Sequence, residues 1–181
     1  DGNAVGVEFR VNTTTLNTQI WGSAAALEDG GFVIVWTSEA QDGSGYGVYG
    51  QRYDVNGDTV GSEFPINQTI ASDQQYPNVT GLADGGFMAA WSSNAQDGDG
   101  WGVYGRRYDA DGVPTADLDF LLNQTTSSDQ QFVMLDARPD GGYVATWTSS
   151  GQDGSSFGVV SRLVEGDLAV GAEDTAIALD I

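Results

Sequence analysis

One sequence motif occurs three times along the chain. It consists of Asp-Gly-Gly and an aromatic residue, a tryptophan four positions later, a Gln-Asp-Gly triplet, and a Gly-Val pair shortly before an arginine. The copies begin at Asp29, Asp84 and Asp140, so they are 84 − 29 = 55 and 140 − 84 = 56 residues apart. A nearly fixed period of this length, with several strand signals in each copy, is typical of propellers and other repeat arrays.

Each copy predicts four short β-strands and no helix. After each Asp-Gly-Gly turn, apolar residues alternate along the chain, as at Phe32, Ile34 and Trp36, which predicts a strand with one buried face. Small residues at Ala26, Gly81 and Ala137 predict that the preceding strand lies nearest a narrow central axis. The strands that open the copies are predicted over 8–11, 63–66 and 119–122. The fold class is therefore all-β.

The order of these strands predicts three blade-like sheets around a pseudo-threefold axis. The chain begins with the strand over 8–11 that the last copy lacks, so we expect this N-terminal strand to close the ring, because closure removes exposed sheet edges. Two alternatives remain open: a six-bladed ring made by two chains, which would be a homodimer, and a β-trefoil. The predicted domain covers residues 1–164, with repeats over about 8–62, 63–118 and 119–164. Residues 165–181 follow no repeat and are interpreted as a linker and the start of another domain.

The net charge of the chain limits the classes of partner that it can bind. It carries 26 acidic and 6 basic residues, a formal net charge of −20, which disfavours binding to nucleic acid and to anionic membranes. No apolar run is long enough to insert in a membrane. The chain has no histidine, cysteine or lysine, so the usual general base, thiol nucleophile and Schiff-base amine are missing. Only a carboxylate pair, as in glycosidases, stays open, and we expect a protein that is not an enzyme.

Polar and aromatic residues recur at the loops that one end of the blades would share. A carboxylate and an amide beside a flat apolar ring are the groups that sugar recognition uses. The alternative is that the rings pack between sheets and the glutamines satisfy loop backbone. The candidate ligand-binding residues are Gln41, Asp42, Tyr46, Gln96, Asp97, Trp101, Gln152, Asp153, Phe157, Gln19, Gln74, Gln130, Trp21, Tyr76 and Phe132.

Calcium is a candidate cofactor. Asp97 and Asp99 stand two residues apart in a glycine-rich loop, a spacing that suits oxygen ligation, although a turn with solvated acids has the same pattern. The other copies have Ser44 and Ser155 in place of Asp99, so a single site is expected.

Two further sets of repeated residues are assigned to structure. Trp36, Trp91 and Trp147 are expected in the core. Arg52, Arg107 and Arg162 are each expected to clamp a carboxylate between blades, because arginine pairs well with carboxylates.

The whole repeat, over residues 1–163, resembles one found in long bacterial RTX-type adhesins and related calcium-dependent secreted proteins. The resemblance rests on Asp-Gly-Gly with Phe32, Phe87 or Tyr143, the three tryptophans, and the Gln-Asp-Gly and Gly-Val segments. It implies type I secretion, a location outside the cell or at the bacterial cell surface, and a module that contacts glycans or surface polymers. The Gly-Gly-x-Gly-x-Asp array of the RTX β-roll is missing, so calcium binding is not implied by that motif.

These observations predict a non-catalytic extracellular adhesion module that binds carbohydrate or a surface polymer, with calcium as a candidate cofactor. A calcium-stabilised structural spacer of a large adhesin is the first alternative. A glycosidase-like hydrolase is the second.

Overall fold

A computed structural model describes residues 2, 4 and 6–166 of the chain. Within this part the protein is built from eleven β-strands, and no helix there could span a membrane. The strands are β1 (Gln19–Ala26), β2 (Phe32–Glu39), β3 (Tyr46–Tyr53), β4 (Thr59–Pro65), β5 (Gln74–Gly81), β6 (Phe87–Asn94), β7 (Trp101–Tyr108), β8 (Phe120–Leu121), β9 (Gln130–Ala137), β10 (Tyr143–Ser150) and β11 (Phe157–Val164). The expectation of an all-β fold is confirmed.

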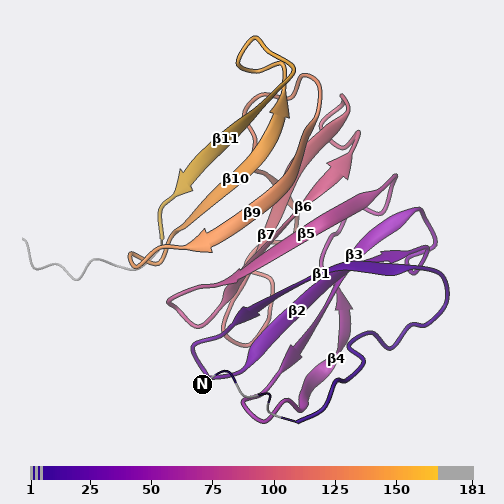
Figure 1. Cartoon of the computed structure of the whole chain (residues 1–181), viewed down its shortest axis with the longest axis vertical. Coiled ribbons are helices and arrows are strands. Elements are labelled where there is room, and N and C mark those ends of the chain that lie inside the picture. Colours follow the sequence, from indigo (N-terminus) through magenta and orange to yellow (C-terminus); the bar gives the residue numbers. More distant parts are fainter. Residues whose placement is uncertain (1, 3, 5, 167–181) are drawn as a thin grey trace, which may run out of the picture.

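The strands form three separate antiparallel sheets, one for each sequence repeat. Their orders are β1-β2-β3-β4, β5-β6-β7-β8 and β9-β10-β11. The sheets follow one another in chain order (Figure 1), and the inner strand β5 contacts both β1 and β9. Separate blade-like sheets replace the joined barrel that a β-trefoil would require.

The Asp-Gly-Gly motif makes the hairpin turn between the first two strands of each sheet. In the first copy the backbone amide of Gly31 donates to the Asp29 carboxylate at 2.8 Å, and Gly30 has a φ of 85°. Asp84 and Asp140 accept the same bond at 3.0 and 3.1 Å. Glycine is required at the positive φ because a side chain is strained there. The turn therefore fixes the strand boundaries three times.

The core lies between neighbouring sheets. Val33 and Val48 of the first sheet pack with Ala89 and Trp91 of the second, and all four are fully buried. An equivalent cluster joins the second sheet to the third. The expectation that Trp36, Trp91 and Trp147 are core residues is confirmed, since each is at most 4% exposed.

Small residues at the axis have a packing reason. A Cβ atom added at Gly81 of β5 would clash with the carbonyl oxygen of Ala26 in β1. Asn78 links the three inner strands: it donates to Ser23 Oγ at 3.3 Å and accepts from the Leu135 amide at 2.7 Å.

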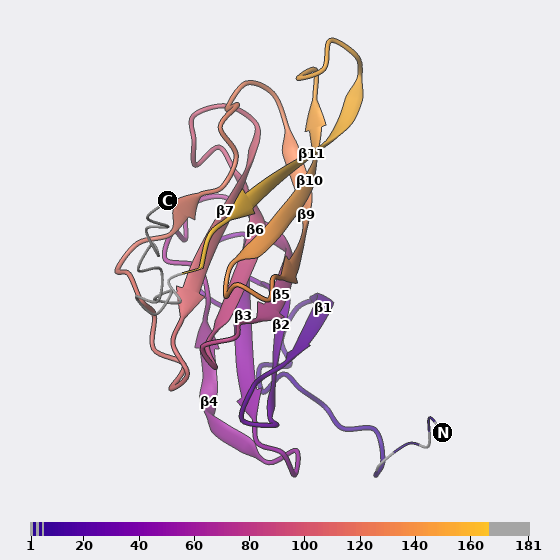
Figure 2. The same cartoon turned by 90° about the vertical axis from the view of Figure 1, so that its left-hand side faces the viewer.

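The prediction that the N-terminal strand closes the ring within one chain is wrong for this structure. Residues 8–11 form no strand, and the Phe9 ring packs on Tyr53 of the first sheet at 5.4 Å. The amide of Thr13 donates to Glu63, also in the first sheet, at 2.7 Å. This segment therefore lies at the opposite end of the molecule from β11 (Figures 1 and 2). Three sheets form an open arc, so the two ends do not meet.

The arginine assignment also needs correction. Arg107 pairs with Asp84 at 2.6 Å and Arg52 with Asp29 at 3.6 Å, and each of these carboxylates belongs to the same repeat as its arginine. Arg162 stands opposite Ala145 in the register of its sheet, as Arg106 stands opposite Ala89, so Arg162 is the equivalent of Arg106. It donates to the carbonyl of Leu122 at 2.8 Å. Arg52 likewise donates to the carbonyl of Ala110 at 2.8 Å, so both Arg52 and Arg162 reach a carbonyl oxygen outside their own sheets.

The predicted linker and following domain at 165–181 lie almost entirely outside the described residues, which end at 166.

Candidate functional site

Three aromatic residues stand at the same irregularity of the three inner strands. The register of β1, β5 and β9 shifts at a β-bulge around Trp21, Tyr76 and Phe132. Their φ angles are 55°, 56° and 60°, in the left-handed region that bulky residues rarely adopt. Each such conformation costs about 1–3 kcal/mol and persists only where the surroundings impose it. The bulges turn all three rings away from the regular strand positions.

The three rings form a continuous row across the arc. The ring centroids of Trp21 and Tyr76 are 4.2 Å apart, and those of Tyr76 and Phe132 are 4.7 Å apart. Trp21 and Phe132 remain 43% and 49% exposed. Large, half-exposed rings in contact with one another give a flat apolar surface that stays open to a ligand.

This row lines a groove of about 470 Å³. Its other lining residues include the inner-strand side chains Ser23, Asn78 and Met134. An apolar groove with a few polar groups is the usual form of a small-molecule site. None of its lining residues is acidic.

The loops after β2 and β6 bring two more predicted aromatics to the same row. Tyr46 lies 6.4 Å from Trp21, and Trp101 lies 6.3 Å from Tyr76, between ring centroids. Phe157, their counterpart in the third repeat, is 65% exposed. Tyr46 and Trp101 therefore lie beside the row of rings, whereas no ring contact joins Phe157 to it within the described residues.

The predicted glutamines divide into two groups. Gln74 and Gln130 are fully buried, where each side chain donates to a loop carbonyl and accepts from an asparagine, Asn67 or Asn123. A ligand cannot reach them, so their assignment as binding residues is wrong. Gln19 makes the same bonds but is less buried.

The glutamines of the Gln-Asp-Gly triplets also bind within the protein. Gln96 and Gln152 accept hydrogen bonds from Ser93 and Ser149 at 2.7 and 2.9 Å, and Gln41 donates to Glu63. Gln96 and Gln152 thus hold their loops to the preceding strand, whereas Gln41 holds its loop to β4.

The aspartates of the triplets pack against a glycine that is the second residue of the next strand. A Cβ at Gly47 would lie 2.7 Å from Asp42, and a Cβ at Gly102 would lie 2.6 Å from Asp97. Asp153 and Gly158 repeat the arrangement at 2.6 Å. This contact explains why glycine follows the triplet at a constant spacing. The three carboxylates therefore belong to the loops and do not line the aromatic groove.

The negative charge of these loops contributes to raising the pKa of two tyrosines. Burial, followed by the charges of Asp42 and Glu63, raises the pKa of Tyr49 to about 12. Burial, followed by the charges of Asp97 and Asp119, raises the pKa of Tyr104 to about 12.

The pKa of Asp119 is also shifted. Burial raises the pKa of its carboxyl group, although the amides of Gln68 and Thr69 donate to it.

The predicted calcium pair is partly used by the backbone. Asp99 accepts from the amide of Ser128 at 3.0 Å, and Asp97 Oδ1 accepts from the amide of Asp99 at 3.4 Å. Asp97 Oδ2 is buried, and no described residue forms a hydrogen bond with it. Over residues 2, 4 and 6–166, no group of three or more acidic side chains is placed to hold a metal ion.

Sequence reasoning missed the polar floor of the groove. Ser23, Asn78 and Met134 occupy one equivalent position in the three inner strands, and the bulge beside them reverses the alternation expected of a regular strand. The only signal in the sequence was a polar residue at this position in two of the three copies, Ser23 and Asn78.

Similarity to known proteins is found in the fold and not in the sequence. No protein-family model matches the chain, and no curated protein does. Three solved structures are similar: a thermostable family-43 glycoside hydrolase (12% identity, TM-score 0.54), an endo-arabinase from Bacteroides thetaiotaomicron (16%, 0.52) and an alpha-L-arabinofuranosidase from Lactobacillus brevis (8%, 0.53). They align with 83%, 81% and 86% of this chain. The chain spans only 55–56% of their lengths.

This likeness contradicts the expectation that the protein is not an enzyme, because the fold is one that named glycoside hydrolases share. The sequence had left only a carboxylate pair open as catalytic machinery, and such a pair suffices for glycoside hydrolysis.

Proposed function

We propose that the protein binds carbohydrate in the groove of Trp21, Tyr76 and Phe132. The observation that carries this proposal is the threefold left-handed conformation of these residues. Folding alone favours glycine at such a φ, so three strained aromatic residues in one open row have a functional reason. A sugar ring packs its C–H face on a row of this kind, and Ser23 and Asn78 supply hydrogen bonds to hydroxyl groups.

The test is calorimetric titration of the chain with oligosaccharides released from arabinan, alongside an array of other glycans. We expect Trp21→Ala to weaken binding at least tenfold. Val60→Ala, a 43% exposed apolar residue outside the groove, is the matched control and should leave binding unchanged. Equal affinity of both variants and the unaltered chain would show that the groove is not the site.

A second candidate function is glycoside hydrolysis, which the fold likeness favours. Hydrolysis needs one carboxyl group as acid and a second carboxylate as nucleophile or base. Asp119, with its raised pKa, fits the acid, and Asp97, with its unpartnered oxygen, fits the second role. Both act on the pKa of Tyr104, so they share one region.

Release of reducing sugar from arabinan and turnover of aryl arabinosides test this candidate. Activity that Asp119→Asn lowers more than a hundredfold, while binding in the groove persists, would support hydrolysis. Binding without any turnover would leave a carbohydrate-binding protein.

The resemblance of the repeat to RTX-type adhesins supports a role in adhesion at the bacterial cell surface. Calcium is proposed at Asp97 and Asp99, with the buried, unpartnered Asp97 Oδ2 in its favour. A rise in melting temperature with millimolar calcium that Asp97→Asn removes would support this site, and an equal rise in both proteins would refute it.

A further inference from the structure

The two boundaries between sheets inside the molecule are built alike. Val33 and Val48 cover the boundary from the first sheet, and Met88 and Val103 cover the next boundary from the second sheet. All four are fully buried. Each sheet thus presents one apolar face to the sheet that follows it.

The third sheet has the same face, and within the described residues no further sheet covers it. Val159, the equivalent of Val48 and Val103, is 78% exposed. β11 pairs with β10 alone, whereas the equivalent strands β3 and β7 also pair with β4 and β8. The described part of the third sheet therefore lacks both a neighbouring sheet and its outer strand.

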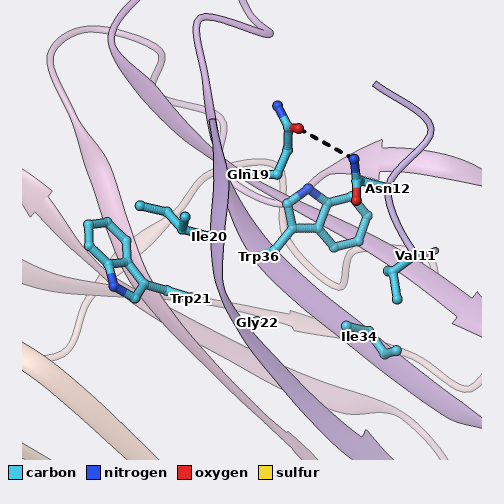
Figure 3. A pocket seen from close by; sticks show the side chains of 8 residues that line it. All are labelled: Val11, Asn12, Gln19, Ile20, Trp21, Gly22, Ile34 and Trp36. Atoms are coloured by element: carbon cyan, nitrogen blue, oxygen red, sulfur yellow. Dashed lines mark hydrogen bonds between the residues drawn. The ribbon is translucent and has the colours of Figure 1, made fainter. Parts of the chain in front are cut away.

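The first sheet has the complementary face. Its Ile34 is only partly buried, although the equivalent Ala89 and Ala145 are fully buried. Val11, Ile34 and Trp36 line a recess of about 350 Å³, shown in Figure 3. The preceding sheet of an array would fill this recess.

The hydrogen bonds of Asn12 indicate which strand would pack beside this recess. Asn67 and Asn123 each donate to a loop carbonyl and to a glutamine, and each accepts a 2.6 Å bond from the amide of Val48 or Val103. Asn12 makes the same two donor bonds, to Thr14 and Gln19, the second of which Figure 3 shows. Within the described residues its side-chain oxygen accepts no backbone amide.

The acidic residue at the start of each copy is a second acceptor, and among the described residues its first copy lacks the donor that its counterparts have. Glu63 accepts from the amide of Thr13, and Asp119 accepts from that of Gln68. By the same spacing Glu8 would accept from the amide of Gln124. Glu8 is exposed at the other end of the arc and forms no such bond in the described part of the chain.

We propose that two copies of this chain associate head to tail, with residues 8–12 of each copy forming the outer strand beside β11 of the other. The Val159 amide then donates to Asn12 of the second copy, and the Gln124 amide donates to its Glu8. An interface of this type joins different surfaces of the two copies, and it ends in a ring when the rotation closes. Two arcs of three sheets make six blades, within the usual range of about 4–8.

Cysteine cross-linking tests the register, because the chain contains no cysteine. Tyr49 pairs with Pro65 and Tyr104 with Leu121, so Val160 should stand opposite Arg10 of the second copy. We expect an Arg10→Cys chain mixed with a Val160→Cys chain to form a covalent dimer under oxidation. Ser155→Cys, in the loop before β11, replaces Val160→Cys as the off-register control and should not cross-link.

Sedimentation in about 0.15 M salt, where the repulsion between two acidic copies is screened, tests the assembly itself. We expect twice the 19.0 kDa of one chain. Val159→Asp should give a folded monomer by circular dichroism. Val113→Asp, at a 55% exposed valine outside the proposed interface, should stay dimeric. The proposal would be overturned if the unaltered chain is a monomer or forms a series of larger oligomers. It would also be overturned if one chain that carries both Arg10→Cys and Val160→Cys cross-links within itself.

Discussion

The side-chain oxygen of Asn67 accepts a 2.6 Å hydrogen bond from the backbone amide of Val48, and both residues are buried. This bond ties the loop that leaves the first sheet to β3 of that sheet. Asn123 and Val103 repeat it in the second sheet at the same distance.

Asn67→Ala should therefore lower the free energy of unfolding by about 2–3 kcal/mol, because it leaves a buried amide without a partner. Asn12→Ala is the matched control, since Asn12 accepts no amide within the described residues. Urea unfolding in dilute solution, where chains are separate, should show a loss at least 1 kcal/mol smaller for Asn12→Ala. Equal losses would mean that the bond to Val48 contributes nothing.

Phe132→Gly should not destabilise the protein, and it should weaken carbohydrate binding. Its φ of 60° suits glycine, and the ring is 49% exposed, so relief of strain offsets the lost contacts with Tyr76. Phe157→Gly, at an exposed strand position without a positive φ, should instead lower stability by about 0.5–1 kcal/mol. The melting temperatures of the two variants, compared with that of the unaltered chain, measure this difference. A larger loss for Phe132→Gly would show that its ring is structural.

Gly81→Ala should be strongly destabilising, because its Cβ would meet the Ala26 carbonyl of the neighbouring inner strand. Overpacking of this kind costs about 1–3 kcal/mol, and backbone cannot move aside as a side chain can. At Gly22, in β1, an added Cβ would lie 3.9 Å from the Val35 carbonyl, an ordinary contact. Gly22→Ala should therefore change the urea midpoint little. Similar midpoints for the two variants would contradict close packing at the axis.

Stability should fall in alkali between about pH 10 and pH 12. Burial raises the pKa of Tyr49, Tyr104 and Tyr143 to about 12, above the ordinary value of 10.0. The unfolded chain loses these protons first, so their contribution is complete below pH 10 and is lost as pH rises toward 12. Urea unfolding at pH 9 and pH 11.5, with tyrosinate absorbance, measures the loss. Tyr104→Phe should show a smaller decline between the two pH values, and an undiminished decline would exclude Tyr104 as a source.

Local sequence determined the blades themselves. The Asp-Gly-Gly turns, the tryptophans of the second strands and the glycine after each Gln-Asp-Gly triplet depend on contacts within one repeat or between adjacent repeats. Every copy therefore carried the same signal. The aromatic platform was also predictable, because its members recur at one phase of the period.

Other features depend on contacts between strands and sheets, and only the tertiary structure shows them. A bulge, which turns Trp21, Tyr76 and Phe132 into the left-handed region, depends on the register between strands and has no signature in one strand alone. Burial of Gln74 and Gln130 likewise depends on the neighbouring sheet, so motif residues of identical type differ in access to ligand. The number of sheets that complete a turn is set by the angle between packed faces. Within residues 2, 4 and 6–166, Phe9 packs against Tyr53 and β11 pairs with β10 alone, a result that strand order could not reveal.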